Sequence, residues 1–179
     1  MKTVLTTTAL LLLTVASGSA HASCPAVFDH TMRKLHSTEQ VNLCEAAAGK
    51  PALLVNTASH CGFTPQLKGL EALSQKYASE GLVVIGFASD DFRQAAKDEA
   101  EAATICYKNY GVKFLMMAPT SVKGNGANPV FTELANQSTP PKWNFNKYLV
   151  DRDGKVVSHF GSSTKPDSEA LTTAIEGVL

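Results

Sequence analysis

The fold is decided by the stretch Pro51-Ala-Leu-Leu-Val-Asn-Thr-Ala-Ser-His-Cys-Gly-Phe-Thr-Pro-Gln66. It begins with a short apolar run rich in strand formers, which predicts a buried strand. A polar loop follows, and after it apolar side chains recur at spacings of three and four residues, which predicts a helix that Gly81 ends. The recurring residues are Leu67, Leu70, Leu73 and Tyr77. The stretch therefore predicts a strand, a loop that carries Cys61, and a helix.

The rest of the chain alternates strands and helices before it ends in a hairpin and a last helix. An Ala- and Glu-rich segment favours a helix that Gly111 closes. The final helix can be capped by Asp167 or Ser168. Asp-Gly at 153–154 is a hairpin-turn signal. The predicted strands are 82–87, 146–150 and 155–159, and the predicted helices are 94–110, 128–135 and 168–175. This order predicts an α/β fold with a central mixed β-sheet, helices on both faces and a late β-hairpin.

Cys61 lies where the predicted strand leads into the predicted helix. The first backbone N–H groups of a helix and the positive end of its dipole favour a thiolate over a thiol, and the thiolate is the nucleophile. Gly62 removes side-chain bulk beside the sulfur, and Pro65 suits a first helical turn. Ligand sites in open α/β sheets also favour the carboxyl end of a strand. The position therefore predicts a reactive cysteine.

Two other interpretations of this loop have to be weighed. Cys61 could be a buried small apolar residue, since cysteine is often buried. His60 could serve as a general base, although neighbouring loop residues often point apart. Thr64 stands where a Cys-x-x-Cys motif would place its second cysteine, so single-sulfur chemistry is favoured over dithiol exchange.

The N-terminus has the layout of a secretory signal peptide. Lys2 precedes an uncharged apolar run at 4–15, and Ala20-His-Ala22 is a small-x-small cleavage signal. The run is too short to span a bilayer comfortably, so a membrane anchor is disfavoured. We therefore expect residues 1–22 to be removed on export, to the periplasm or alternatively to the outside, and residues 23–179 to form one domain.

Composition narrows the set of partners and cofactors. The formal net charge is 0, which argues against a nucleic-acid partner because phosphate binding needs a basic surface. No later segment is long and apolar enough for stable membrane association. Metal-binding and phosphate-loop motifs are absent from the sequence, so we expect no metal, nucleotide or other cofactor. Four cysteines remain after cleavage; they allow three complete pairings, among which the sequence does not choose.

Several long segments resemble the glutathione peroxidase family. The active-site segment 55–66 is one, and Lys142-Trp-Asn-Phe-Asn-Lys-Tyr-Leu-Val-Asp-Arg-Asp-Gly-Lys-Val156 is another. Shorter matches lie at 69–73, 81–87, 110–114 and 128–131. The resemblance spans roughly residues 41–170. It implies a thioredoxin-like fold and the reduction of hydrogen peroxide or organic hydroperoxides.

The resemblance also implies site residues. Cys61 matches the peroxidatic residue, and Trp143 and Asn144 match a Trp-Asn pair that donates hydrogen bonds near the sulfur. Such donors stabilise a thiolate and help the leaving oxygen as the O–O bond breaks. Taken alone, Trp143 would be interpreted as a core residue.

One position departs from the family pattern. Asp91 stands where a glutamine is expected, and an ionised carboxylate near the sulfur would oppose thiolate formation. Asp91 would have to be protonated, turn away, or accept the proton of the peroxide. Gln94 lies close in sequence and is a weaker candidate for the same role.

The other cysteines suggest two further interpretations. Cys106 lies in a segment that resembles the resolving-cysteine segment of thioredoxin-dependent family members, which implies a Cys61–Cys106 disulfide and local unwinding of the predicted helix. The alternative is a buried helical cysteine. Cys24 and Cys44 lie at the edge of the matched region or outside it, so they form a structural bridge in an exported protein or remain free thiols.

We therefore expect a thiol-dependent peroxidase in which Cys61 becomes a sulfenic acid that Cys106 or an external thiol resolves. A thioredoxin-like protein or glutathione would be the reductant. The alternatives are a periplasmic thiol–disulfide oxidoreductase and a redox sensor without turnover, for which Asp91 is the main support.

Overall fold

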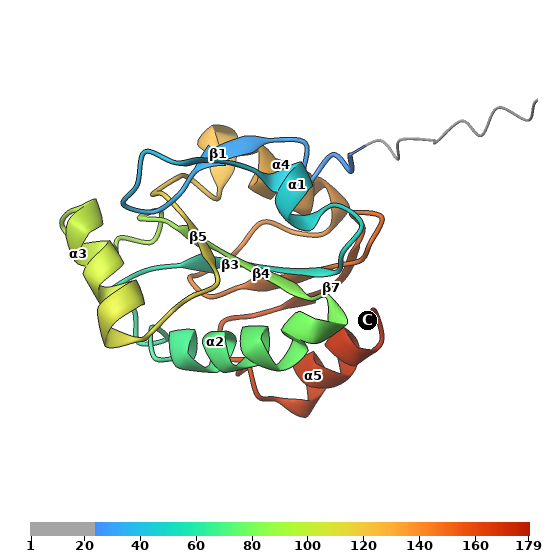
Figure 1. The fold of residues 1–179 in the computed structure, drawn as a ribbon. Coiled ribbons are helices and arrows are strands. Elements are labelled where there is room, and N and C mark those ends of the chain that lie inside the picture. The colour runs from blue at the N-terminus through green and yellow to red at the C-terminus, as the bar shows by residue number, and fades with distance from the viewer. Residues whose placement is uncertain (1–23) are drawn as a thin grey trace, which may run out of the picture.

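The computed structural model describes residues 24–179, so the predicted signal peptide at 1–22 lies outside the described residues. A five-stranded sheet runs through the centre in the order β5-β4-β3-β6-β7 (Figure 1). β3 pairs in parallel with β4 and antiparallel with β6, which confirms the predicted mixed sheet. The strands are β3 (Ala52–Thr57), β4 (Val83–Ala88), β5 (Leu115–Met117), β6 (Lys147–Val150) and β7 (Val156–Phe160).

Helices cover both faces of this sheet, as the strand–helix order predicts. α2 (Gln66–Tyr77) and α5 (Glu169–Glu176) lie on one face, and α1 (Leu43–Ala47) and α4 (Pro129–Gln137) lie on the other (Figure 1). Successive side chains of β3 alternate between the two apolar cores: Leu53 packs with the α2 side and Leu54 with the α4 side. Every residue of β3 is buried, which is why its sequence is a continuous apolar run.

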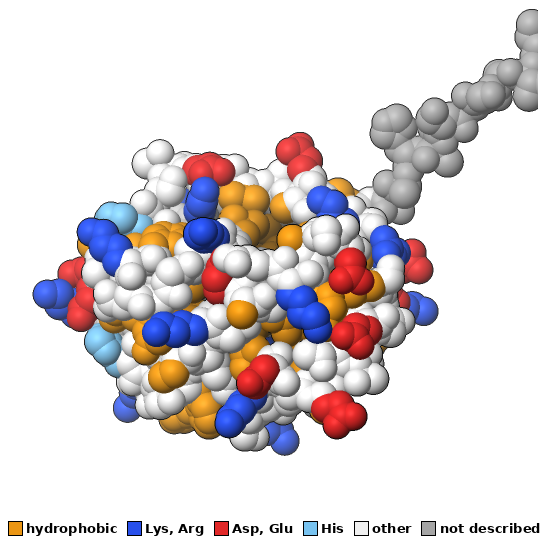
Figure 2. All heavy atoms as spheres, turned by 60° about the horizontal axis from the view of Figure 1, so that its bottom comes forward, with side chains coloured by type: hydrophobic (Ala, Val, Ile, Leu, Met, Phe, Trp, Pro, Cys, Tyr) orange, Lys and Arg blue, Asp and Glu red, His pale blue; other side chains and the backbone are white. Residues whose placement is uncertain are grey.

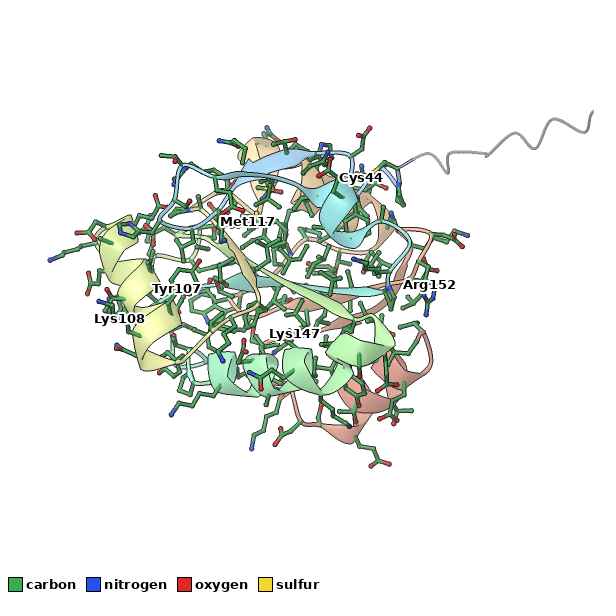
Figure 3. All side chains as sticks on the ribbon, viewed as in Figure 1. Cys44, Tyr107, Lys108, Met117, Lys147 and Arg152 are labelled. Carbon is green, nitrogen blue, oxygen red and sulfur yellow. A yellow bond between two sulfur atoms is a disulfide. The ribbon has the colours of Figure 1, made fainter. Side chains whose placement is uncertain are left out.

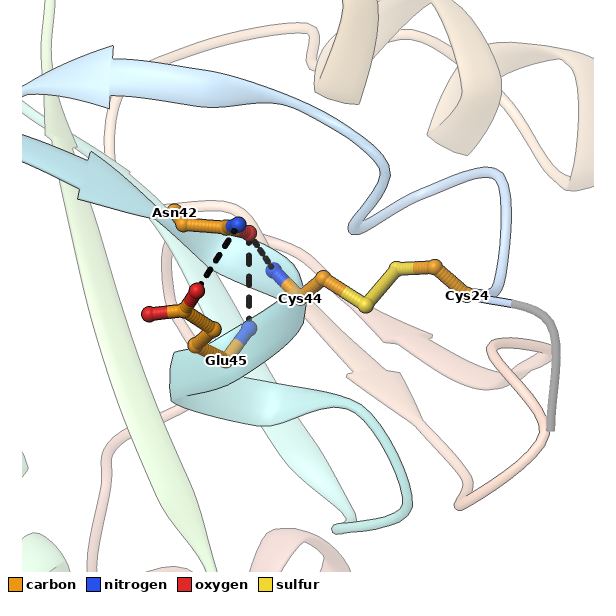
Figure 4. Close-up of a disulfide and its surroundings, with 4 residues drawn as sticks. All are labelled: Cys24, Asn42, Cys44 and Glu45. Carbon is orange, nitrogen blue, oxygen red and sulfur yellow. Dashed lines mark hydrogen bonds between the residues drawn. A yellow bond between two sulfur atoms is a disulfide. The ribbon is translucent and has the colours of Figure 1, made fainter. Parts of the chain in front are cut away.

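A small N-terminal hairpin extends the α1 side. It pairs β1 (Thr31–Arg33) with β2 (Gln40–Asn42) and leads into α1, which Asn42 caps by accepting from the Cys44 N–H at 2.9 Å. A disulfide joins Cys24 to Cys44 across this hairpin, with the two Cα atoms 5.9 Å apart (Figure 4). Of the two alternatives for these cysteines, the structure therefore has the bridge.

The predicted helix at 94–110 is wrong in its first part and in its type. The α-helix α3 begins only at Glu99, because Arg93 adopts a left-handed backbone (φ 56°) and Asp98 caps the helix by accepting from the Glu101 N–H at 2.8 Å. α3 (Glu99–Ala103) is followed by the π-helical segment η2 (Thr104–Asn109). Gly111, at φ 68°, ends it as predicted.

The remaining signals are mostly confirmed. Gly81 (φ 98°) ends the 3₁₀ turn η1 (Ala78–Glu80) after α2, Asn128 caps α4 through the Phe131 N–H, and Gly154 (φ 81°) turns the β6–β7 hairpin. A second 3₁₀ turn, η3, spans Gly124–Gly126. The short elements β1, β2, β5 and α1 were not anticipated. Within residues 24–179, no helix is long and apolar enough to cross a membrane.

Candidate active site

Cys61 lies in the loop between β3 and α2, at the carboxyl end of the strand. The Thr64 hydroxyl accepts from the Cys61 N–H at 3.0 Å and lies 2.9 Å from the Ala58 carbonyl, so it braces the loop from within. Cys61 is only 6% exposed. Thr64, at the position of the second cysteine in a dithiol motif, therefore has a structural role here.

A backbone donor reaches the sulfur. The Phe63 N–H donates to Cys61 Sγ at 3.4 Å. The α-helix begins at Gln66, so this donor belongs to the turn before α2 rather than to the helix itself. The structure thus gives the sulfur one backbone N–H donor from the preceding turn, where the sequence predicted the first N–H groups of the helix.

The second part of the site is the tight turn 143–146, which leads into β6. Asn56 of β3 holds it: Asn56 Nδ2 donates to the Trp143 carbonyl at 3.0 Å, Asn56 Oδ1 accepts from the Asn146 N–H at 3.0 Å, and the Asn56 carbonyl accepts from the Phe145 N–H at 2.7 Å. Phe145 is buried and has a left-handed backbone (φ 61°), a conformation that bulky residues rarely adopt. The turn is therefore held in a strained conformation by a strand residue.

Strand pairing brings these two segments together. β3 and β6 are antiparallel neighbours, with Val55 opposite Lys147, so the end of β3 and the start of β6 lie at the same edge of the sheet. β4 runs parallel to β3, and its end, followed by the segment that carries Asp91 and Gln94, lies at that edge too. All the candidate residues except Cys106 thus come from loops at one sheet edge.

Gln94 connects the two segments. Its carbonyl accepts from the His60 N–H at 2.9 Å, and its side-chain oxygen accepts from Asn144 Nδ2 at 3.1 Å. Asn144 is fully buried, and its Oδ1 is the buried side-chain polar atom in residues 24–179 that has no hydrogen-bond partner. The structure therefore places Gln94, the weaker candidate from sequence, between the cysteine loop and Asn144.

Asp91 has different partners. Its carboxylate accepts from the Val122 N–H at 2.6 Å, from the Lys123 N–H at 3.1 Å and from the Ser121 hydroxyl at 3.0 Å. These donors all belong to the loop that follows β5. Among the three alternatives for Asp91, this arrangement agrees with a carboxylate turned away from the cysteine loop.

Trp143 is the aromatic residue of the site that faces solvent. It is 41% exposed and packs against Phe92, with ring centroids 5.3 Å apart, and Lys123 Nζ lies 4.3 Å from the Phe92 ring centroid. The interpretation of Trp143 as a core residue is therefore wrong. Together, Trp143 and Phe92 give this edge of the sheet an accessible aromatic surface.

His60 points toward α3 rather than across the loop. Its Nε2 lies 3.4 Å from Glu101 Oε1. This contact ties the cysteine loop to the helix and gives no support to a general-base role.

Cys106 lies in η2 and is 4% exposed. Burial raises the pKa of its thiol to about 11. Cys61 and Cys106 are both free thiols and belong to the same apolar core. A hollow of about 210 Å³ is lined by Ala58 and Ser59, before Cys61, and by Cys106 and Glu99 on the helical side.

Lys147 lies buried just beside the site. Its side chain is fully enclosed between the sheet and α2 (Figure 3), and its Nζ donates to Gln66 Oε1 and, at 2.7 Å, to the Thr164 carbonyl. Burial lowers the pKa of Lys147 to about 8. This lysine therefore joins the start of α2 to the loop after β7.

Sequence reasoning missed Asn56, Phe92 and Lys147. A polar Asn within the apolar run 51–58 and a Lys that opens a strand were the available signals. Within the described residues, no cluster of three His, Cys, Asp or Glu side chains could hold a metal ion.

A free cysteine in the loop between a central strand and the next helix, with a backbone N–H on its sulfur, is the kind of site that a thiol-dependent redox protein needs. The crystal structure of Trgpx in its apo form supports the thioredoxin-like fold: it has a TM-score of 0.66 and 31% identity, and the match covers 86% of this chain and 95% of that one.

Sequence comparison then gives the family. The glutathione peroxidase family model matches residues 27–135. The glutathione peroxidase-like peroxiredoxin gpx1 of Schizosaccharomyces pombe is 46% identical over 137 residues, covering 73% of this chain and 85% of that protein. The hydroperoxy fatty acid reductase gpx1 of Synechocystis is 42% identical, covering 68% and 79%. The chain belongs to the glutathione peroxidase family and is a thiol-dependent peroxidase.

Proposed function

We propose that Cys61 reduces hydrogen peroxide and organic hydroperoxides, that Cys106 resolves the oxidised sulfur as an intramolecular disulfide, and that a thioredoxin-like protein reduces this disulfide outside the cytoplasm. The observation that carries the proposal is the hydrogen-bonded chain from the cysteine loop through Gln94 to Asn144. It joins the loop of the candidate nucleophile, through the residue before Cys61, to a buried amide at one edge of the sheet.

In the first step, the Cys61 thiolate attacks one peroxide oxygen and the O–O bond breaks. Cys61 becomes a sulfenic acid, and the other oxygen leaves as hydroxide or alkoxide and takes up a proton. The Phe63 N–H supports the thiolate, and Gln94 holds Asn144 beside the cysteine loop. Trp143 supplies the exposed wall of the site.

In the second step, the Cys106 sulfur attacks the sulfenic sulfur, the Cys61–Cys106 bond forms and water leaves. A buried thiol with a pKa of about 11 is a poor nucleophile, so Cys106 must first leave its enclosed position. The π-helical geometry of η2 favours this, since π-helical turns are rare and are often found at functional sites. A dithiol reductant then returns both cysteines to thiols.

Organic hydroperoxides would bind in an apolar groove next to the cysteine loop. The groove has a volume of about 710 Å³ and is lined by α2, by residues 163–167 and by Gly62 and Phe63. Its position suits the acyl chain of a fatty-acid hydroperoxide, the substrate class named for the Synechocystis relative. Ala72→Arg, on the exposed side of α2, should raise KM for such a substrate and leave KM for hydrogen peroxide unchanged.

The Cys24–Cys44 bridge supports the proposed export. Structural disulfides persist in oxidising compartments and are rare in the cytosol. Together with the small-x-small sequence at 20–22, this favours the periplasm. N-terminal sequencing of the protein recovered from the periplasm of its host should begin at Ser23; recovery of intact Met1 in the cytosol would contradict export.

Steady-state peroxidase activity tests the proposal most completely. Hydrogen peroxide and a fatty-acid hydroperoxide should each be assayed with a thioredoxin system and with glutathione. Cys61→Ser should abolish all turnover, whereas Cys106→Ser should lose thioredoxin-supported turnover but still form one sulfenic acid per chain. Wild-type turnover by Cys61→Ser, or insulin-disulfide reduction without peroxide turnover by the wild type, would overturn it.

A further inference from the structure

The segment that carries Cys106 has little helical stability of its own. α3 has five residues and η2 has six, and helices of this length are marginal in water. The segment is therefore held by contacts that other elements make with it. In Figure 1 it stands at one end of the sheet, beside the N-terminal hairpin.

The contacts with the hairpin are concentrated at the first residue of α3. Arg33 Nη1 and Nη2 donate to the two carboxylate oxygens of Glu99, each at 2.7 Å, in a bidentate pair. The same carboxylate accepts from the His36 N–H, and the Tyr107 hydroxyl of η2 lies 3.4 Å from the Leu35 carbonyl. Residues 33–36 thus contact both the start of α3 and η2.

The hairpin itself is fixed to the outer strand β5 and to the residue that follows it. The Ala118 N–H donates to the Arg33 carbonyl and the Leu35 N–H donates to the Met116 carbonyl, both at 2.8 Å. The Cys24–Cys44 bridge spans the same hairpin. Arg33 therefore projects from a rigid backbone, so breaking its pair with Glu99 moves the helical segment rather than the hairpin.

We propose that Arg33 is a positioning residue that latches residues 99–109 through Glu99 and so limits how fast Cys106 can reach the oxidised Cys61. This inference rests on the proposed resolving role of Cys106. Reaction requires an opened segment, and its rate follows the population of that open state. Each contact that exists only in the closed segment lowers this population.

Arg33→Gln removes the bidentate pair and tests the latch, and Glu99→Gln removes it from the other side. Lys34→Gln is the matched control, because Lys34 is the next residue and its ion pair with Glu39 stays within the hairpin. In the reduced protein, without peroxide, Arg33→Gln and Glu99→Gln should raise the rate of Cys106 alkylation about three- to tenfold. Lys34→Gln should leave it at the wild-type rate.

After stoichiometric hydrogen peroxide, Arg33→Gln should speed formation of the Cys61–Cys106 disulfide by a similar factor and leave the rate of Cys61 sulfenic acid formation unchanged. Arg33→Lys keeps the positive charge but cannot form the bidentate pair with Glu99, so its rate of disulfide formation should lie between those of wild type and Arg33→Gln. Wild-type rates of Cys106 alkylation in both Arg33→Gln and Glu99→Gln would overturn the latch. If alkylation accelerates but no disulfide forms in any variant, the latch holds and the proposed resolving step fails.

Discussion

At the scale of residues, amide groups rather than charges hold the candidate site together. Asn56 fixes the turn that carries Trp143 and Asn144, and Gln94 joins Asn144 to the loop of Cys61. Neutral amides position groups without placing a negative charge near a thiolate. Asp91 and Lys147, two of the ionisable groups nearby, have their own partners on adjacent loops.

Asp91 should contribute more to the stability of the fold than to the reactivity of the Cys61 sulfur. Asp91→Ala leaves the N–H groups of Val122 and Lys123 without their acceptor, so the free energy of unfolding should fall by about 1–3 kcal/mol in urea titration. Ser121→Ala, which removes a single donor to the same carboxylate, should cost less. The pH profile of Cys61 alkylation should be the same in Asp91→Gln and wild type; a displaced profile would mean that Asp91 acts on the sulfur.

Lys147 should leave a signature in the pH dependence of stability. Burial lowers its pKa in the folded state to about 8 from an ordinary value of 10.5, so between these values the unfolded chain binds a proton that the folded protein does not. Stability should therefore rise with pH above about 8, by at most about 1.4 kcal/mol per pH unit. The raised pKa of Cys106 opposes this increasingly as the pH approaches 9, so the contribution of Lys147 is the difference in slope between wild type and a Lys147 variant in urea unfolding between about pH 7.5 and 9.

Lys147→Met should lose this rise, whereas Lys165→Met, an exposed lysine on the adjoining loop, should keep it. The same slope in wild type and Lys147→Met would show that Lys147 stays charged throughout.

At the scale of elements, the sequence predicts the helices and strands that have a strong local pattern, and it misses the short strands that form only by pairing with other segments. The leucine pattern of α2 and the apolar run of β3 are local signals, and both elements are present. β1, β2 and β5 have three residues each and are held by pairing at an edge, so no local pattern identifies them. The Ala- and Glu-rich composition of 94–110 favours helix but carries no signal for a π-helical turn.

The candidate site divides in the same way. Cys61, Trp143 and Asn144 follow from the family resemblance. The contact of Gln94 with Asn144 could not be predicted, because it joins residues 50 apart in sequence and follows a left-handed backbone at Arg93. A non-glycine residue in that conformation has no reliable sequence signal.

Amide hydrogen exchange should show η2 as a weak element. The amides of 104–109 should exchange faster than those of 66–77, because α2 packs along the core over twelve residues whereas α3 and η2 together form only a short, irregular helix. α2 in the same protein serves as the reference. Equal protection in both segments would argue against local unwinding of the Cys106 segment.

At the scale of the whole molecule, the sheet gathers the candidate site at the carboxyl ends of β3 and β4, and the disulfide ties the N-terminal segment to α1. Acidic and basic side chains are interspersed over the face shown in Figure 2, with apolar areas between them. That face therefore presents no broad field of one charge.

Removing the Cys24–Cys44 bridge should destabilise the fold without touching the site. The bridge joins residues 20 apart in sequence, for which loop entropy predicts a loss of about 3 kcal/mol in the double variant Cys24→Ser/Cys44→Ser. The urea midpoint should fall, and the rate of Cys61 oxidation should stay at the wild-type value. An unchanged midpoint in the double variant would show that the bridge adds no stability.

Peptide mass spectrometry tests most directly whether peroxide oxidises the Cys61 sulfur and whether Cys106 then resolves the oxidised sulfur. One equivalent of hydrogen peroxide is added to protein whose Cys61 and Cys106 are reduced. We predict a disulfide between the Cys61 and Cys106 peptides, with the Cys24–Cys44 bridge intact. Peroxide consumed while Cys61 remains a free thiol, or Cys61 converted to sulfinic acid with Cys106 unlinked, would contradict it.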